Sequence, residues 1–145
     1  MLHLLKLYPE QVSRQWDSIV TAIESALPAI TPNTLDRMNR VFESILAGLL
    51  NVYVFHDENK KLKGIVSVAI IESVDGVARQ LLLYSLYGYR GVTMEQFNEG
   101  FELLRELARG LNCESIIAYS TVPSLIEYVK RVGGDASQTF LRMEV

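Results

Sequence analysis

A glycine-containing turn between an apolar segment and a helix start is the stretch of this chain most suited to chemistry. The apolar run 81–87 leads into residues 88–91 (GYRG), after which Thr93 and Gln96 fit a capping box that opens a helical segment. Backbone N–H groups at a helix start attract anions, and α/β proteins often hold phosphates where a buried strand feeds such a start. The turn could therefore cradle a phosphate. It could equally be an ordinary strand-to-helix connection, because glycine permits many turns.

Several tyrosines lie near this turn or in the last third of the chain. They are Tyr84, Tyr87, Tyr89, Tyr119 and Tyr128. They could line a cleft where two parallel strands diverge, or form the edge of an amphipathic core with their hydroxyls in water. Clustering near an expected change of strand direction favours a ligand cleft.

Other reactive side chains are isolated in the sequence. Glu72, near the end of an apolar segment, could act as a general base toward an amine, but its place beside a turn also fits a solvated carboxylate. Cys113 has no histidine placed to activate it, so burial as a small apolar group is the simpler interpretation. His3 and His56 have no metal ligand at useful spacing, and we expect no metal site.

Length and composition indicate one globular domain over residues 1–145. The chain is 49% hydrophobic and 21% charged, which is typical of a folded protein. A net charge of −3 gives no support to nucleic-acid binding. The single cysteine excludes an internal disulfide and leads us to expect a cytoplasmic protein, and the apolar runs are too short to predict a membrane helix.

Hydrophobic periodicity predicts a strand and two helices in the first third of the chain. Residues 2–8 form the strand. Residues 9–27 form a helix with Pro9 in its first turn, where a missing N–H costs nothing. Residues 32–49 form the second helix, and Thr31 is suited to cap it.

The remainder predicts five strands and two helices. The strands are expected at 51–57, 62–73, 77–87, 114–120 and 137–145, and the helices at 93–110 and 123–132. Asp75 and Gly76 predict a two-residue hairpin turn. Gly100, inside the longer helix, costs about 1 kcal/mol against alanine, which a close approach to the sheet would offset.

Connection lengths indicate how the strands run. The three strands between residues 51 and 87 are joined by short turns and must be antiparallel, whereas the strand–helix–strand unit 77–120 must be a parallel crossover. The expected fold class is α/β (α+β mixed), with a mixed, mostly antiparallel sheet and helices on both faces.

This order of elements resembles the GCN5-related N-acetyltransferase (GNAT) fold over essentially the whole chain. The resemblance rests on the two early helices, the DG-containing hairpin, the long helix ending LRELARGLNCESIIAYS and the late segment IEYVKRVGG. It implies an acyl-CoA-dependent N-acyltransferase in which an amine attacks the thioester directly. Members of the family hold the acyl-CoA pyrophosphate on backbone N–H groups of an R/Q-x-x-G-x-G/A loop at the start of the central helix.

The corresponding loop of this chain departs from that pattern. Arg90 and Gly91 match part of it, but the second and third small residues are missing. Glu95 brings a negative charge that suits the helix dipole and would repel a pyrophosphate. The resemblance assigns acetyl-CoA binding to Leu86, Tyr87, Gly88, Arg90, Gly91, Thr93 and Gln96.

The resemblance also implies a tyrosine that protonates the CoA thiolate. The family position corresponds to Val129, and a shift of one residue to Tyr128 turns a helical side chain by about 100°. We expect Tyr128 or Tyr119 to donate this proton, with Glu72 as the candidate base.

Two functions stay open at this point. One is an atypical GNAT-like N-acyltransferase that uses acetyl-CoA and acts on a small-molecule or protein amine. The other is a catalytically inactive GNAT-fold binding or assembly protein that has lost CoA binding, for which a homodimer is one expectation. Neither a nucleic acid nor a membrane is expected as a partner.

Overall fold

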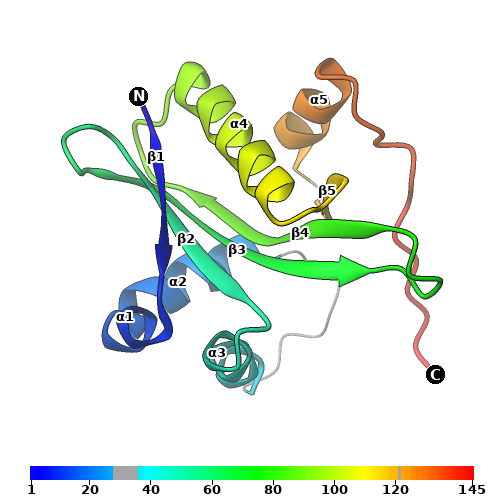
Figure 1. Cartoon of the computed structure of the whole chain (residues 1–145), viewed down its shortest axis with the longest axis horizontal. Helices are drawn as coiled ribbons and strands as arrows, with labels where there is room; N and C mark the ends of the chain where they lie inside the picture. The colour runs from blue at the N-terminus through cyan, green and yellow to red at the C-terminus, as the bar shows by residue number, and fades with distance from the viewer. Residues whose placement is uncertain (28–35, 121) are drawn as a thin grey trace.

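A five-stranded mixed sheet lies between two layers of helices in the computed structural model, which describes residues 1–27, 36–120 and 122–145 (Figure 1). The strands are β1 (His3–Leu7), β2 (Asn51–His56), β3 (Leu62–Glu72), β4 (Arg79–Gly88) and β5 (Ser115–Ala118). The helices are α1 (Pro9–Arg14), α2 (Trp16–Ala26), α3 (Arg37–Leu46), α4 (Met94–Gly110) and α5 (Pro123–Arg131). The expected α/β class with helices on both faces is confirmed.

The strands lie side by side in chain order, β1-β2-β3-β4-β5. Neighbours are antiparallel from β1 to β4, and β4 pairs with β5 in parallel through the crossover helix α4. The connection lengths predicted these directions for β2, β3, β4 and β5. The central strand β3 is buried over most of its length because α2 covers one face and α4 the other.

Helices cover both faces of the sheet (Figure 1), and each face has its own core. On the α4 face the buried residues are Leu2, Phe55, Val66, Val68, Leu81, Leu83, Leu104, Ala108 and Cys113. On the face covered by α1, α2 and α3 they are Val12, Ile19, Ala22, Ile23, Val41, Ile45, Leu50, Val52 and Ile65. Alternate residues of β3 serve the two cores, since successive strand side chains point to opposite faces.

The predicted helix 9–27 is wrong in one respect, because it is broken at Gln15. This residue ends α1 and begins α2 with φ −112° and ψ 20°. The break coincides with the placement of Trp16, whose ring packs 4.7 Å from the ring of Phe42 on α3. A continuous stripe of apolar residues in the sequence gives no sign of such a break between two helices.

The second helix, α3, is shorter than the expected 32–49. The expected start of this helix at residue 32 and its expected cap, Thr31, lie outside the described residues. At its other end Gly48 takes a left-handed conformation, φ +77°, just beyond the C-cap Ala47. This is a common way to end a helix, so the helical spacing of Leu49 was misleading.

The hairpin between β3 and β4 is present, but its loop is longer than the expected two residues. The N–H of Ser73 donates to the carbonyl of Ala78 at 2.9 Å, which leaves residues 74–77 as the loop. Asp75 organises it by accepting hydrogen bonds from the Ser73 hydroxyl and from the Val77 N–H. These bonds lower the pKa of the Asp75 carboxyl below its usual value.

The strand expected at 137–145 is not formed. The segment is exposed, and Leu141 and Met143 retain most of their accessible surface. Phe140 of this segment packs against Tyr119, with ring centroids 5.6 Å apart. Alternating apolar residues fit a strand, but a strand also needs a neighbouring backbone to pair with, which alternation cannot supply.

Candidate functional site

β4 and β5 separate halfway along β4. Their pairing runs from Gln80–Ser115 to Leu83–Ala118, where β5 ends, while β4 continues to Gly88. From Tyr84 onward, the edge of β4 that faces away from β3 has no strand partner in the described part of the chain. Peptide groups on a free strand edge can bind an extended ligand.

A β-bulge marks the point of separation. Ser67 of β3 pairs with Ser85, but the next residue, Val68, pairs with Leu83, so Tyr84 is an extra residue in β4. Bulges bend a strand and often occur beside active sites, where they redirect side chains. Because the sequence around Tyr84 contains neither glycine nor proline, it gives no local signal for this bulge.

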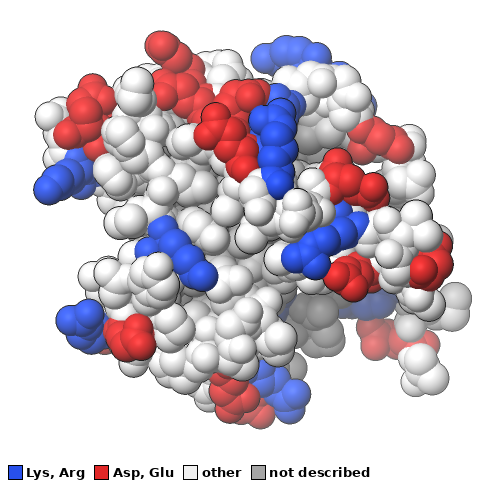
Figure 2. Space-filling view, in the orientation of Figure 1, with Lys and Arg blue, Asp and Glu red and all other residues white. Residues whose placement is uncertain are grey.

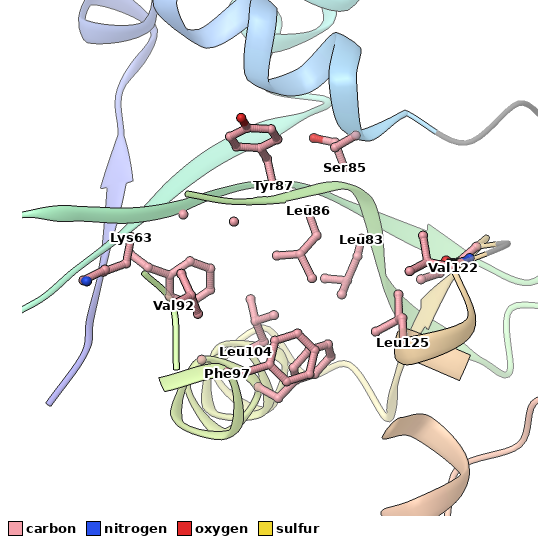
Figure 3. Close-up of a pocket in the computed structure, with 18 of the residues that line it drawn as sticks. Lys63, Leu83, Ser85, Leu86, Tyr87, Val92, Phe97, Leu104, Val122 and Leu125 are labelled. Atoms are coloured by element: carbon pink, nitrogen blue, oxygen red, sulfur yellow. Dashed lines mark hydrogen bonds between the residues drawn. The ribbon is translucent and has the colours of Figure 1, made fainter. Parts of the chain in front are cut away.

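A cavity of about 250 Å³ occupies the space between the separated strands (Figure 3). On the α4 side it is lined by Leu86, Phe97 and Leu104. On the α2 side, Ser85 and Tyr87 point away from these residues, toward the helix above the sheet (Figure 3). The cavity therefore has walls from both faces of the sheet.

The structure brings four of the seven residues expected to bind the cofactor to this cavity. Leu86, Tyr87, Gly88 and Gln96 line it, whereas Arg90, Gly91 and Thr93 do not. The latter three lie in the loop between β4 and α4 and at the helix cap. The roles of all seven stay predictions.

The start of α4 is capped as predicted. The hydroxyl of Thr93 accepts from the N–H of Gln96 at 3.1 Å, and the side-chain oxygen of Gln96 accepts from the N–H of Thr93 at 3.2 Å. Two of the donors at this helix end are therefore already satisfied. The N–H groups of Met94 and Glu95 have no acceptor within the described residues, as is usual in a first turn.

Lys63 is the residue at this site that sequence reasoning missed. It lies on β3 and lines the cavity, and only 9% of its surface is exposed. Its Nζ lies 3.5 Å from the carbonyl oxygen of Gly91, in the β4–α4 loop. Among the described residues no carboxylate lies within ion-pair distance of this ammonium. In the sequence Lys63 follows a polar turn and is indistinguishable from Lys60 and Lys61.

The two tyrosines proposed as proton donors differ in their relation to the cavity. Tyr119 lies on the cavity wall, just beyond the end of β5, and is 44% exposed. Tyr128 is buried on α5, with its ring 4.9 Å from that of Phe97 and 4.8 Å from that of Phe101. Because both phenylalanines line the cavity, Tyr128 lies one layer behind its wall.

Glu72 is not brought to the cavity. It lies at the far end of β3, where it is exposed and forms an ion pair with Arg79 at 2.9 Å. This placement agrees with the interpretation of Glu72 as a solvated carboxylate. Cys113 is buried, as the simpler interpretation predicted.

Two tyrosines on the α2 side of the sheet pack against each other. The rings of Tyr87 and Tyr89 are in edge-to-face contact with centroids 5.0 Å apart. Burial, together with the neighbouring Tyr87, raises the pKa of the Tyr89 phenol above its ordinary value, so it stays protonated at neutral pH.

The described residues contain neither a group of three or more side chains able to hold a metal ion nor a helix long and apolar enough to cross a membrane.

Sequence comparisons give no family, but solved structures match the fold. No protein-family model matches the chain, and no curated protein matches it in sequence. Three solved structures illustrate the likeness. A predicted acetyltransferase with acetyl-CoA from Clostridium acetobutylicum shares 16% identity over 99% of this chain and 96% of that one, with a TM-score of 0.70. The glucosamine-6-phosphate N-acetyltransferase of Arabidopsis thaliana shares 16% over 99% and 98%, with a TM-score of 0.63. An aminoglycoside antibiotic 6′-N-acetyltransferase from Acinetobacter baumannii shares 9% over 100% and 98%, with a TM-score of 0.67.

Proposed function

The chain has the fold of the GCN5-related N-acetyltransferases, and from that premise we propose that it is an acyl-CoA-dependent N-acyltransferase with acetyl-CoA as its donor. The observation that carries the proposal is the separation of β4 from β5, which leaves a free strand edge along a cavity. When bound, acetyl-CoA would supply an acyl group activated as a thioester. The free edge of β4 from Tyr84 to Gly88 would hold its extended pantetheine arm by main-chain hydrogen bonds.

Lys63 would contact the phosphates. An ammonium group has three donors, and burying it with few partners is costly. Its one hydrogen-bond partner among the described residues, the Gly91 carbonyl, is at the long limit for a hydrogen bond. A phosphate beside the β4–α4 loop would satisfy the remaining donors. The unpaired N–H groups of Met94 and Glu95 would add donors of the kind that a helix start presents to anions.

Lys63 would thus compensate for the small residues that the β4–α4 loop lacks. A cation contributed by β3 would replace some of the backbone donors that the loop lacks, and would counter the negative charge of Glu95 at the helix start.

Tyr119 would donate the proton to the departing thiolate. Its place on the cavity wall favours it over Tyr128, which lies behind Phe97 and Phe101. A general acid must come within hydrogen-bond reach of the atom it protonates. The cavity wall supplies no carboxylate base from the described residues, so the amine would have to enter as its free base.

Isothermal titration with acetyl-CoA tests the proposal. We expect saturable binding with a dissociation constant in the micromolar range, about −8 kcal/mol. The variant Ala118→Trp fills the cavity mouth at the end of β5 and should abolish the heat, whereas Ala78→Trp, at the distant hairpin, should not. Absence of heat from the unaltered protein at about 1 mM ligand, equivalent to −4 kcal/mol, would end the proposal.

A specific observation favours a second candidate, a catalytically inactive binding or assembly protein on the same fold. The capping box already occupies the N–H groups of Thr93 and Gln96, and exposed Glu95 places a negative charge beside them. This candidate predicts no binding of acetyl-CoA and a self-associating species, for which sedimentation at two concentrations is the measurement.

A further inference from the structure

The two sides of the cavity are chemically different. This inference rests on the proposed function. Lys63 and the start of α4 place the phosphate end of the donor on the α4 side. The α2 side is then available for the acyl acceptor, and the residues that line it include Ala26 at the end of α2 and the bulged Tyr84. Tyr87 also lines it and points toward the helix above the sheet (Figure 3).

The described residues that line the cavity offer no negative charge to an ammonium group. Of the described residues that line it, Lys63 alone has a charged side chain, and that charge is positive. On the face shown in Figure 2, the acidic and basic residues are interspersed, with no broad acidic area among the described atoms.

An ammonium acceptor would therefore be disfavoured twice. It would lose its hydration without gaining a carboxylate partner from the described residues that line the cavity, and it would find no carboxylate base among them to remove its proton. Both penalties disappear for an amine that is already uncharged at neutral pH.

We propose that the acyl acceptor is a small arylamine, whose nitrogen is attached directly to an aromatic ring and is unprotonated at neutral pH. The ring would pack against Tyr84 and Tyr87, since aromatic pairs gain from edge-to-face and offset contacts. A volume of about 250 Å³ is at the small end for ligand cavities, which suits one ring beside the thioester.

The transfer balances without any further reactant. The arylamine nitrogen forms a bond to the acyl carbon with its lone pair, and the carbon–sulfur bond breaks with its electron pair remaining on sulfur. The proton that nitrogen loses finally resides on that sulfur, through Tyr119 as the donor. The products are an N-acetylarylamine and a free thiol.

Aniline and benzylamine are matched probes, because both carry one ring and one amine but only benzylamine is mainly protonated at neutral pH. With acetyl-CoA saturating, we expect thiol release with aniline to exceed that with benzylamine or the polycation kanamycin by about tenfold in kcat/KM, a difference of ~1.4 kcal/mol. Calorimetry in the presence of CoA should show the same order of binding. Equal or faster reaction of either cation, or no reaction with aniline although acetyl-CoA binds, would overturn this inference alone. Failure of acetyl-CoA itself to bind would overturn the proposed function as well.

A charge variant gives an independent test of the same idea. Ala26→Asp places a carboxylate on the acceptor side of the cavity, and Ser25→Asp places the same charge one residue earlier, at an exposed position off the wall. Ala26→Asp should improve the binding of benzylamine relative to aniline by about fivefold, the effect of a partly exposed ion pair of ~1 kcal/mol. Ser25→Asp should leave the ratio unchanged. An equal response of both variants would show that the cavity charge does not select the acceptor.

Discussion

Ser67 and Ser85 lie opposite each other on β3 and β4 and share a hydrogen bond between their buried hydroxyls. They form the last regular pair before the bulge at Tyr84, on the α2 face of the sheet. Each hydroxyl satisfies the other in surroundings that would otherwise leave it unpaired. This buried polar pair therefore lies directly beside the bulge at the edge of the cavity.

Removing both of these hydroxyls should cost less than the sum of the two single losses. We expect Ser67→Ala or Ser85→Ala to lower the free energy of unfolding by about 1–3 kcal/mol, because the remaining hydroxyl is left buried without a partner. The double variant should be less destabilised than the sum of the two. Urea denaturation of the four proteins measures this coupling, and additive losses would show that the hydroxyls are independent.

Two glycines beside Phe55 should respond oppositely to alanine. A Cβ on Gly64 would lie 2.9 Å from the carbonyl oxygen of Tyr87, so the backbone of β4 would have to move. A Cβ on Gly100 would meet Phe55 at 3.5 Å, an ordinary contact. The helix is thus close to the sheet, as the sequence suggested, but leaves room for a methyl group.

We expect Gly64→Ala to destabilise the protein by about 1–3 kcal/mol and to weaken acetyl-CoA binding, since β4 forms the cavity edge. Gly100→Ala should stabilise it by about 0.5–1 kcal/mol, through a higher helix propensity. Thermal unfolding and calorimetry report the two effects separately. Equal losses in both variants would contradict the assignment of the close contact to Gly64.

Local sequence signals predicted the elements of this fold well where residues act through their neighbours in the chain. Examples are the capping box of Thr93 and Gln96 and the glycines that end α5. The spacing of apolar residues likewise located the central strands. The relative directions of β2, β3, β4 and β5 were predictable because the lengths of their connections leave few choices.

What the sequence did not reveal depends on residues that are distant in the chain. The bulge at Tyr84 appears only in the pairing with β3, and the place of Lys63 beside Gly91 joins residues on separate elements. The missing final strand is a case of the same kind, because its alternating residues gave no information about a partner. Four predicted site residues reached the cavity because they lie on β4 and α4, which the apolar pattern located correctly.

Lys63 should control the binding of the phosphate end of the donor. Lys63→Met retains the apolar stem but removes the charge, and we expect acetyl-CoA affinity to fall by about tenfold or more, as for loss of a charge-assisted hydrogen bond. Lys61→Met, at an exposed position nearby, is the matched control and should have little effect. S-acetyl-pantetheine, which lacks the nucleotide phosphates, should bind both variants equally. A loss of affinity for that ligand too would mean that Lys63 shapes the cavity rather than binding phosphate.

The two tyrosines can be separated by removing their hydroxyls alone. Tyr119→Phe should lower kcat by about a hundredfold with little change in KM, because a general acid acts in the transition state. Tyr128→Phe keeps the ring that packs against Phe97 and Phe101 and should leave kcat within about twofold, which is below 1 kcal/mol in barrier. The opposite result, with Tyr128→Phe inactive but fully folded by circular dichroism, would identify Tyr128 as the proton donor. Phe97 and Phe101 would then have to move aside during the reaction.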